Sequence, residues 1–454
     1  MSVRVSSNQM VYSYQKQLNE ANNRQNKLLE QGDGSKLHRP SDDSVGYSKY
    51  LRYNVSDNEN TQYDKNVSTA ISWMKSSDAA LTNMTEIQKT FIEKTISAGN
   101  DTKGTSDMQA IGREMMAEIE EMVSLGNTMQ GDSYLFGGTR DLTKPFSMSD
   151  TEVDRGLAKT LDENQSAFFS GDDGVANSNG TSKLTQMLSL TGSDGNTYYL
   201  NTSDGYIYTK DFVDSGYKDV VASGTNVVDA STMAAGRIDA FANKDVTVST
   251  YFKNTGERKA ADATQDGKLT ATVSDGNGGT NTVNFTLDTI KQRIVTYTGD
   301  DNSVSMVKKN GSTEPIADTV NVSGSAIFGN DIFDDANSGN KSSGAAMLNQ
   351  MLTIQAKVDA DDKNWLVSDG VTVANAADDN TINTTTKLGA RQQLYTAVKD
   401  MLTTQGELIT SDITDVSATD VAELAVKLMQ ENTVYNMSLS LGARILPQSL
   451  SDYL

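Results

Sequence analysis

The closing stretch of the chain, from Asp420 to Leu454, constrains the fold more than any other part of the sequence. A seam repeats there every seven positions in two neighbouring columns, Val421, Leu428, Tyr435 and Gly442 in one and Ala425, Asn432, Leu439 and Leu446 in the other. This repeat predicts a long amphipathic helix with a seam of the coiled-coil type. From Thr419 to Leu446 the helix is about 40 Å long at ~1.5 Å per residue. Its seam therefore needs a partner helix, and Ser417, Thr419 and Asp420 provide capping groups at its start.

The other end of the chain offers that partner. Residues 8 to 31 carry a stripe whose members are spaced by three or four positions: Met10, Tyr14, Leu18, Ala21, Gln25 and Leu28. Much of the segment is Gln and Asn, so the stripe is weak and is typical of a helix that becomes ordered in an assembly. An ordinary surface helix explains this segment alone equally well. The pairing of the two termini is nevertheless the first structural prediction.

Two further helices are expected before residue 131. A loop is expected at Leu37–Asp43, because Pro40 disfavours helix at Arg39. Ser41 can cap a new helix, and Asp42 and Asp43 favour its start. The seam of that helix is Val67, Ala70, Met74, Ser77, Leu81, Met84, Gln88 and Phe91, and the helix stops near Gly99. The next stripe is Met108, Ile111, Met115, Ile119, Met122, Gly126 and Met129, ending at Gly131. Methionine fills irregular gaps between helices, so this stripe is interpreted as core.

A change of composition near residue 147 marks a β-rich insert. Gly, Asn, Ser, Thr and Asp dominate to about residue 340, with short alternating runs at 197–200, 206–209, 269–273 and 282–287. Turn dipeptides such as Asp194-Gly195 and Asp204-Gly205 separate these runs, as expected of antiparallel strands. Helix returns at Ala345–Val358, an acidic loop follows from Asp359 to Asn380, and a helix over Leu388–Ile409 precedes the closing seam.

Composition excludes several classes of function. With 39 basic and 60 acidic residues the net charge is −21, so nucleic acid and anionic membranes are poor partners. No stretch reaches the ~18 apolar residues of a membrane span, and the first residues lack the apolar core of a signal peptide.

The sequence also argues against a catalytic or metal site. There is no Cys, and His38 is the only His; a zinc site or a His-based triad is therefore not expected, nor is any cofactor. Runs at 172–174 and 275–279 resemble calcium loops but lack the bidentate Glu. An enzyme using paired carboxylates stays as the most distant alternative. An adhesive or glycan-binding insert, with Tyr198, Tyr199, Tyr206 and Tyr208 as an aromatic face, is the nearer one, although ordinary strand packing fits their alternation better.

Five stretches together resemble the flagellin-like axial proteins of bacterial flagella. They are Arg39-Pro40-Ser41-Asp42-Asp43 with Ser44-Val45-Gly46; Ser133-Tyr134-Leu135-Phe136-Gly137-Gly138-Thr139; Tyr297-Thr298-Gly299-Asp300 with Val322-Ser323-Gly324 and Ile327-Phe328; Leu388-Gly389-Ala390-Arg391; and Leu441-Gly442-Ala443-Arg444-Ile445 with Leu450–Leu454. The first two resemble the junction proteins between hook and filament more than filament flagellin. The resemblance covers about residues 1–150 and 290–454. Pro447 departs from it, because proline inside the terminal helix favours a kink or a stop after Leu446.

The resemblance implies an α+β, flagellin-like fold in which paired terminal helices carry an inserted outer domain. The expected domains are 1–36 with 415–454 as a terminal coiled coil, 37–148 with 341–414 as a helical bundle, and 149–340 as the β-rich insert. It implies a structural, non-enzymatic adaptor at the hook–filament junction, exported to the flagellum without a cleaved signal peptide. The implied partners are further copies of the chain, the other hook-associated protein, flagellin and a cytoplasmic export chaperone. Filament flagellin is the alternative. The expected assembly seam is Met10, Tyr14, Leu18, Val421, Leu428, Tyr435, Leu439 and Leu446.

Overall fold

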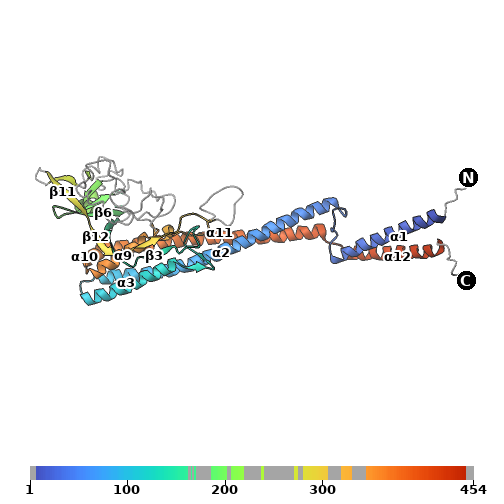
Figure 1. The fold of residues 1–454 in the computed structure, drawn as a ribbon, viewed down its shortest axis with the longest axis horizontal. Coiled ribbons are helices and arrows are strands. Elements are labelled where there is room, and N and C mark those ends of the chain that lie inside the picture. The colour runs from blue at the N-terminus through green and yellow to red at the C-terminus, as the bar shows by residue number, and fades with distance from the viewer. Residues whose placement is uncertain are drawn as a thin grey trace. The chain divides into compact units, whose positions relative to one another are not determined.

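The computed structural model describes residues 7–161, 165, 168–169, 186–201, 206–218, 237–239, 270–274, 280–304, 319–329 and 344–445. The backbone forms two compact units, Met1–Ser68 with Ala397–Leu454, and Thr69–Thr396. Helices are confirmed at both ends of the chain and strands in its middle (Figure 1). The fold is therefore α+β and flagellin-like, as predicted.

The first unit is built from helices that pair across the two ends of the sequence. Helix α1 (Ser7–Glu30) lies beside α12 (Val421–Ile445), and the two run antiparallel (Figure 1). The first part of α2 (Ser44–Ala98) is joined to the last part of α11 (Val371–Ser417) by the buried Asn60, whose Nδ2 donates to the carbonyl oxygen of Leu402 at 3.0 Å. Asp420 caps α12, since its Oδ1 accepts from the backbone N–H groups of Ala422 and Glu423.

Helices also form the body of the second unit. The rest of α2 lies there with α3 (Thr105–Gly126), α8 (Gly324–Phe328), α9 (Ala346–Asp359) and the start of α11. Helix α9 packs against α3 and α8, and Lys94 of α2 forms ion pairs with Glu114 and Glu118 of α3. Every residue of the predicted α2 seam from Val67 to Phe91 is buried. Both polar members donate hydrogen bonds: Ser77 Oγ to the carbonyl of Trp73 at 3.1 Å, and Gln88 Nε2 to Thr381 Oγ1 at 2.9 Å. The methionine stripe of α3 is core as predicted, with Met108, Met115, Ile119 and Met122 buried.

Two sequence-based boundaries were wrong. Helix α3 ends at Gly126 and not at Gly131; a hairpin of β1 (Met129–Gln130) and β2 (Ser133–Tyr134) follows, with Gly131 at its turn in the left-handed region and Met129 exposed. The predicted acidic loop 359–380 is largely helical: α10 (Lys363–Trp365) and a π-helical turn, η4 (Leu366–Gly370), lead into α11. Burial of Leu366, Val373, Ala374 and Ala377 explains this error, because apolar contacts stabilise a segment whose charges suggested a loop.

Two short strand pairs connect the helices to the insert. Strand β3 (Phe146–Met148) pairs with β13 (Val295–Tyr297), and β4 (Val153–Gly156) pairs with β12 (Thr289–Gln292). Buried Asn349 of α9 acts on the first pair like an extra strand residue. Its Oδ1 accepts from the N–H of Val295 at 2.8 Å and its Nδ2 donates to the carbonyl of Val295 at 2.9 Å. Side-chain bonds of this kind fasten the base of the insert to the helices.

The remaining described strands form one antiparallel sheet. They are β5 (Ala158–Thr160), β6 (Gln186–Gly192), β7 (Thr197–Asn201), β8 (Tyr206–Thr209), β9 (Arg237–Asp239), β10 (Thr270–Ser274) and β11 (Thr280–Leu287). The spatial order is β10-β11-β6-β7-β8-β9, and β5 also pairs with β6. We call it the outer sheet. The predicted runs at 197–200, 206–209 and 282–287 are strands, and Gly195 has the positive φ of the predicted turn.

Candidate assembly surface

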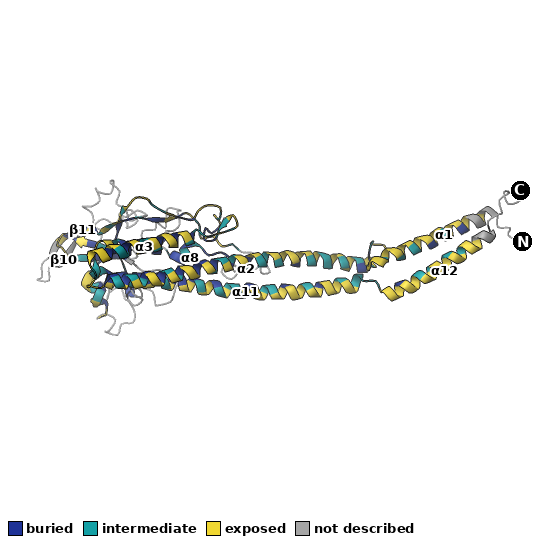
Figure 2. Ribbon diagram, turned by 90° about the horizontal axis from the view of Figure 1, so that it is seen from below, coloured by how far each residue is buried: buried dark blue, intermediate teal, exposed yellow. Residues whose placement is uncertain are grey.

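The α1–α12 pair holds together through a thin seam (Figure 2). On α1 the least exposed side chains follow the predicted stripe, with Tyr14 and Ala21 buried and Leu18, Gln25 and Leu28 half-buried. Polar bonds lie within the seam: Arg24 Nε is 3.1 Å from Glu431 Oε1, and Gln25 Nε2 donates to Asn432 Oδ1 at 3.2 Å. A seam so poor in buried apolar area gives the pair little stability of its own.

The structure shifts one column of the predicted seam on α12. Leu428 and Tyr435 face the seam, but their neighbours there are Leu424, Glu431 and Ser438. Val421 and Leu439 are exposed and lie outside the α1 contact. The structure does not describe the side chains of Met10 and of residues 442–444, nor any part of Leu446 and Pro447. The polar bonds to Glu431 and Asn432 account for the shift, because they fix how α12 is rotated against α1, and an apolar count ignores them.

The free face of α12 carries a second apolar stripe. Five large apolar side chains are exposed there: Val426, Met429, Val434, Met437 and Leu441. Val421 and Leu439 are exposed as well, but at ~3.6 residues per turn they lie beside the α1 seam. Met429 is 71% exposed and Met437 is 67% exposed. Apolar residues gathered on one helix face mark a contact surface. The sequence contained this signal, since α12 is apolar on more positions than one seam needs, but a single heptad assignment hides it.

Both helical arms of the first unit are interrupted at the same point, between α1 and α2 on one arm and between α11 and α12 on the other. The 3₁₀ turn η1 (Gln31–Asp33) ends at Gly34, whose φ of 99° suits glycine. The N–H of Lys36 donates to the carbonyl of Ser417 at 2.7 Å, and the N–H of Thr419 donates to that of Gly34 at 3.0 Å. The two breaks therefore satisfy each other's backbone groups and form one structural joint.

The Arg39–Asp43 motif belongs to that joint and binds back onto α1. Arg39 Nη2 lies 2.8 Å from Glu30 Oε1, and Lys27 Nζ lies 3.7 Å from Asp42 Oδ1. Asp43 Oδ1 accepts from the N–H groups of Val45 and Gly46 at 3.0 Å each, so Asp43 caps α2, while Pro40 and Ser41 are exposed. The cap predicted at Ser41 thus falls two residues later. His38 lies in this loop, with Nε2 3.3 Å from Asp33 Oδ1.

The second motif, Tyr134–Thr139, packs against residues far along the chain. Leu135 and Phe136 are fully buried and Gly137 and Gly138 are buried, while Tyr134 is half-buried. The hydroxyl of Tyr297 donates to the carbonyl of Phe136 at 2.9 Å and accepts from the N–H of Gly324 at 3.1 Å. A Cβ on Gly324 would lie 2.5 Å from Tyr297 and 2.7 Å from Phe146, so glycine is required there. Burial raises the pKa of the Tyr297 hydroxyl well above its usual range.

Asp300 completes this cluster. Its carboxylate accepts from the N–H of Thr139 at 2.8 Å, from the Thr139 hydroxyl at 2.5 Å and from the N–H of Asn302 at 3.1 Å. Burial by itself would raise the pKa of Asp300, but these hydrogen bonds favour the charged form and hold the pKa below its usual range. The motifs at 134–139 and 297–300 thus form one site, and its role is structural: it packs the two segments together.

The described residues give little support to the other classes of site. Tyr198, Tyr199 and Tyr208 are buried, the last two in a core with Leu161, Phe168, Phe169 and Met187, so they form no exposed aromatic face; the side chain of Tyr206 is not described. Among the residues that the structure describes, no group of three His, Cys, Asp or Glu side chains is arranged to hold a metal ion. None of the described helices is long and apolar enough to cross a membrane. The calcium-like runs 172–174 and 275–279 lie outside the described residues.

The N-terminal part of the chain is similar to the flagellin-like proteins. Residues 5–141 match the family described as the bacterial flagellin N-terminal helical region, and the resemblance is confirmed over this part of the chain.

Individual relatives include both kinds of axial protein. Over 139 residues the chain is 25% identical to flagellar hook-associated protein 3 of Escherichia coli, covering 30% of this chain and 44% of that protein. It is 27% identical over 147 residues to polar flagellin C of Vibrio parahaemolyticus, covering 32% of this chain and 37% of that one. The chain thus spans less than half the length of these relatives. A crystal structure of flagellar hook-associated protein 3 from Legionella pneumophila aligns with 81% of this chain and 98% of that one, at 10% identity and a TM-score of 0.36.

Proposed function

We propose that this protein is a structural adaptor of the bacterial flagellum, located where the hook meets the filament. In this role it polymerises through its terminal helices and joins the hook-associated ring to flagellin. It performs no catalysis; its chemistry is the burial of apolar surface between copies.

The exposed apolar face of α12 is the observation that carries the proposal. Helix α1 covers only the stripe around Leu424 and Leu428, which leaves the stripe around Met429 and Met437 open. Fully burying a side chain of this size is worth about 1.5–3 kcal/mol. Contacts with neighbouring copies supply that burial, which offsets the entropy cost of ordering the thinly packed ends.

Its partners follow from this position. Below it lies the other hook-associated protein, above it flagellin, and before export a cytoplasmic chaperone covers the C-terminal helix. The protein leaves the cell through the flagellar export channel and resides on the extracellular flagellum. The terminal pair, the helical body and the β-rich insert act as three domains, near the boundaries 36/37, 148/149, 340/341 and 414/415. The insert faces outward and takes no part in the joint.

A deletion strain tests the proposal. We expect its cells to carry hooks without filaments and to lose flagellin into the medium, and expression of the full chain to restore filaments. Normal filaments in the deletion strain would refute the junction role.

Filament flagellin is the second candidate, because the chain matches polar flagellin C as well as hook-associated protein 3. Immunogold labelling with an antibody to the insert separates the two. A single band at the base of the filament supports the junction adaptor, whereas label along the whole filament supports flagellin.

A further inference from the structure

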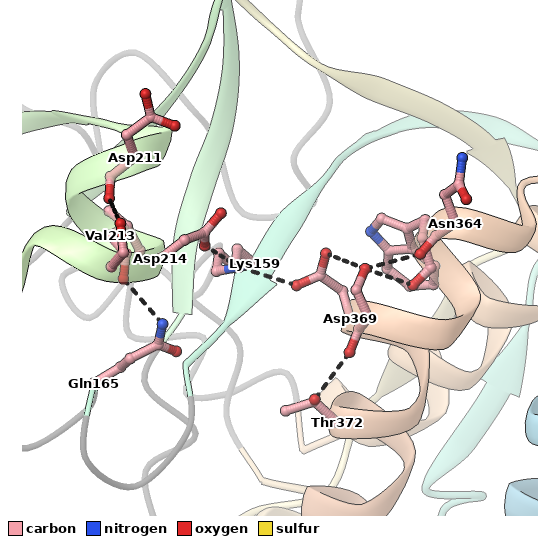
Figure 3. A network of polar contacts seen from close by, with 11 residues as sticks. Lys159, Gln165, Asp211, Val213, Asp214, Asn364, Asp369 and Thr372 are labelled. Atoms are coloured by element: carbon pink, nitrogen blue, oxygen red, sulfur yellow. Dashed lines mark hydrogen bonds and ion pairs between the residues drawn. The ribbon is translucent and has the colours of Figure 1, made fainter. Parts of the chain in front are cut away.

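A largely buried lysine joins the outer sheet to the helical body. Lys159, on β5, has Nζ 2.9 Å from Asp214 Oδ1 and 3.3 Å from Asp369 Oδ1, and Figure 3 shows its side chain between the two carboxylates. Only 13% of the Lys159 side chain is exposed. Its ammonium also lies 5.4 Å from the centre of the Tyr199 ring.

The two carboxylates come from different parts of the second unit. Asp214 lies in η2 (Phe212–Gly216), a π-helical turn after β8 whose Val213 is buried in the aromatic core of the insert. Asp369 lies in η4, the π-helical turn that leads into α11. The Lys159–Asp214 pair is therefore internal to the insert, whereas the Lys159–Asp369 pair crosses from the insert to the helices.

Hydrogen bonds hold both turns in place. Gln165 Nε2 donates to the carbonyl of Val213 at 3.0 Å, next to Asp214 (Figure 3). On the other side the Ser368 hydroxyl is 3.3 Å from Asp369 Oδ2, and Thr372 Oγ1 donates to the carbonyl of Ser368 at 3.0 Å. π-Helical turns are rare and often occur at functional positions. Here a π turn presents a carboxylate to the lysine from each side.

The lysine stays charged in this setting. Burial alone would lower its pKa, but the negative charge of Asp369 and the bond to Asp214 outweigh it and raise the pKa to about 12. Breaking either ion pair is therefore unfavourable, because it leaves a charge that is neither paired nor well solvated.

The main-chain connections between the two parts are narrow. The chain enters the outer sheet through Gly156–Ala158, where β4 gives way to β5, and leaves it through Leu287–Thr289, where β11 gives way to β12. The two crossings are bridged by backbone hydrogen bonds: the N–H of Leu157 donates to the carbonyl of Asp288 at 2.7 Å, and Ser189 of β6 bonds to both residues. We call this short bridge the hinge, because it is the part that must twist when the outer sheet turns.

We propose that Lys159 is an electrostatic latch, which fixes the orientation of the outer sheet on the helical body by binding Asp369 across the hinge. With the latch closed, the insert is displayed in one orientation. With it open, the outer sheet turns on its two crossings while both parts remain folded.

Spin-label distance measurements on the full-length chain test this. The chain has no native Cys, so Gln109→Cys on α3 and Thr282→Cys on β11, both exposed, place one label on each part. We expect a single narrow distance distribution in the parent. Lys159→Met and Asp369→Asn should each at least double its width, with unchanged helical circular dichroism.

Two matched variants sharpen the test. Asp214→Asn removes a carboxylate from the same lysine but leaves the pair that crosses the hinge, so the distribution should stay narrow. Lys210→Met removes an exposed lysine of the insert and should have no effect. A narrow distribution in Asp369→Asn would overturn the latch. So would equal broadening in Asp214→Asn, which would mean that the whole cluster serves local packing. If Lys159→Met does not fold, the two Asn variants still decide.

Discussion

At the scale of single residues, the second unit depends on a few side chains that pack against residues far away in the sequence. Tyr297 touches Phe136, Phe146 and Gly324, which lie in three separate parts of the chain. The sequence shows these residues as motifs but cannot show that they meet, because each is far from the others along the chain.

A methyl group at Gly324 tests the tightness of that cluster. Because the new Cβ would overlap two buried rings, Gly324→Ala should lower the free energy of unfolding by about 1–3 kcal/mol. Gly389→Ala is the control: it lies inside α11 with open space around it and should raise stability by about 0.5–1 kcal/mol. Urea denaturation measures both, and equal effects of the two variants would contradict the packing argument.

Asp300 should make the unfolding free energy depend on pH. Its pKa is lower in the folded protein than the ordinary value of 3.8. The stabilisation is therefore present above the unfolded pKa and is lost as the pH falls through the folded pKa. Asp300→Asn should be less stable than the parent at pH 6, and the difference should shrink below about pH 4. Thermal melts between pH 3 and pH 7 would show it; a difference that does not change with pH would argue against this carboxylate.

At the scale of elements, α12 is the clearest case of a helix with two faces. One face binds α1, and the other is apolar and exposed. The sequence predicted the helix and a seam, and the structure assigns residues to each face.

The two faces should respond differently to substitution. Met429→Asp with Met437→Asp changes only the free face, so the monomer should keep its thermal midpoint but fail to enter the flagellum. Leu424→Ala with Leu428→Ala removes a buried and a half-buried leucine from the α1 contact. It should weaken that contact by about 1–2 kcal/mol for each leucine and speed hydrogen exchange throughout α1. Motility assays and exchange mass spectrometry separate the faces. Normal motility of the Met429/Met437 variant would refute an assembly role for the free face.

The insert should be removable at its base. Gly156 and Thr289 are direct partners in the β4–β12 ladder, so they stand only about 5 Å apart. Replacing residues 157–288 by a short Gly/Ser turn should therefore leave β4, β12 and the helices intact, and filaments should form in the deletion strain. Loss of filaments with a stable, exported protein would mean that the insert contributes to the joint.

At the scale of the whole molecule, packing density differs between the two units. The second unit buries aromatic and methionine side chains around α2, α3 and α9, whereas α1 and α12 bury few. The buried core is therefore concentrated in the second unit, and the α1–α12 pair is thinly packed.

Limited proteolysis of the monomer should reveal this difference. We expect rapid trimming of both ends to a core near residues 40 to 410, because the α1–α12 seam gives little protection against local opening. Polymerised protein serves as the control and should resist cleavage at the same sites. Full protection of both ends in a verified monomer would contradict the expectation.

The sequence alone determined that both ends of the chain are helical and which faces of α2 and α3 are core. There a single apolar stripe repeats with the helical period, and only one side can be buried. It also predicted the strands around Tyr199 and Tyr208, but not that both faces of β7 are buried, as the burial of Tyr198 beside Tyr199 shows. Tertiary structure decided the rest. The rotation of α12 depends on Arg24–Glu431 and Gln25–Asn432, the helical start of 371–380 depends on burial of Val373 and Ala377, and the Lys159 network depends on two π turns. In each case the deciding contact joins residues distant in the chain, and local patterns do not record which distant partner a residue will meet.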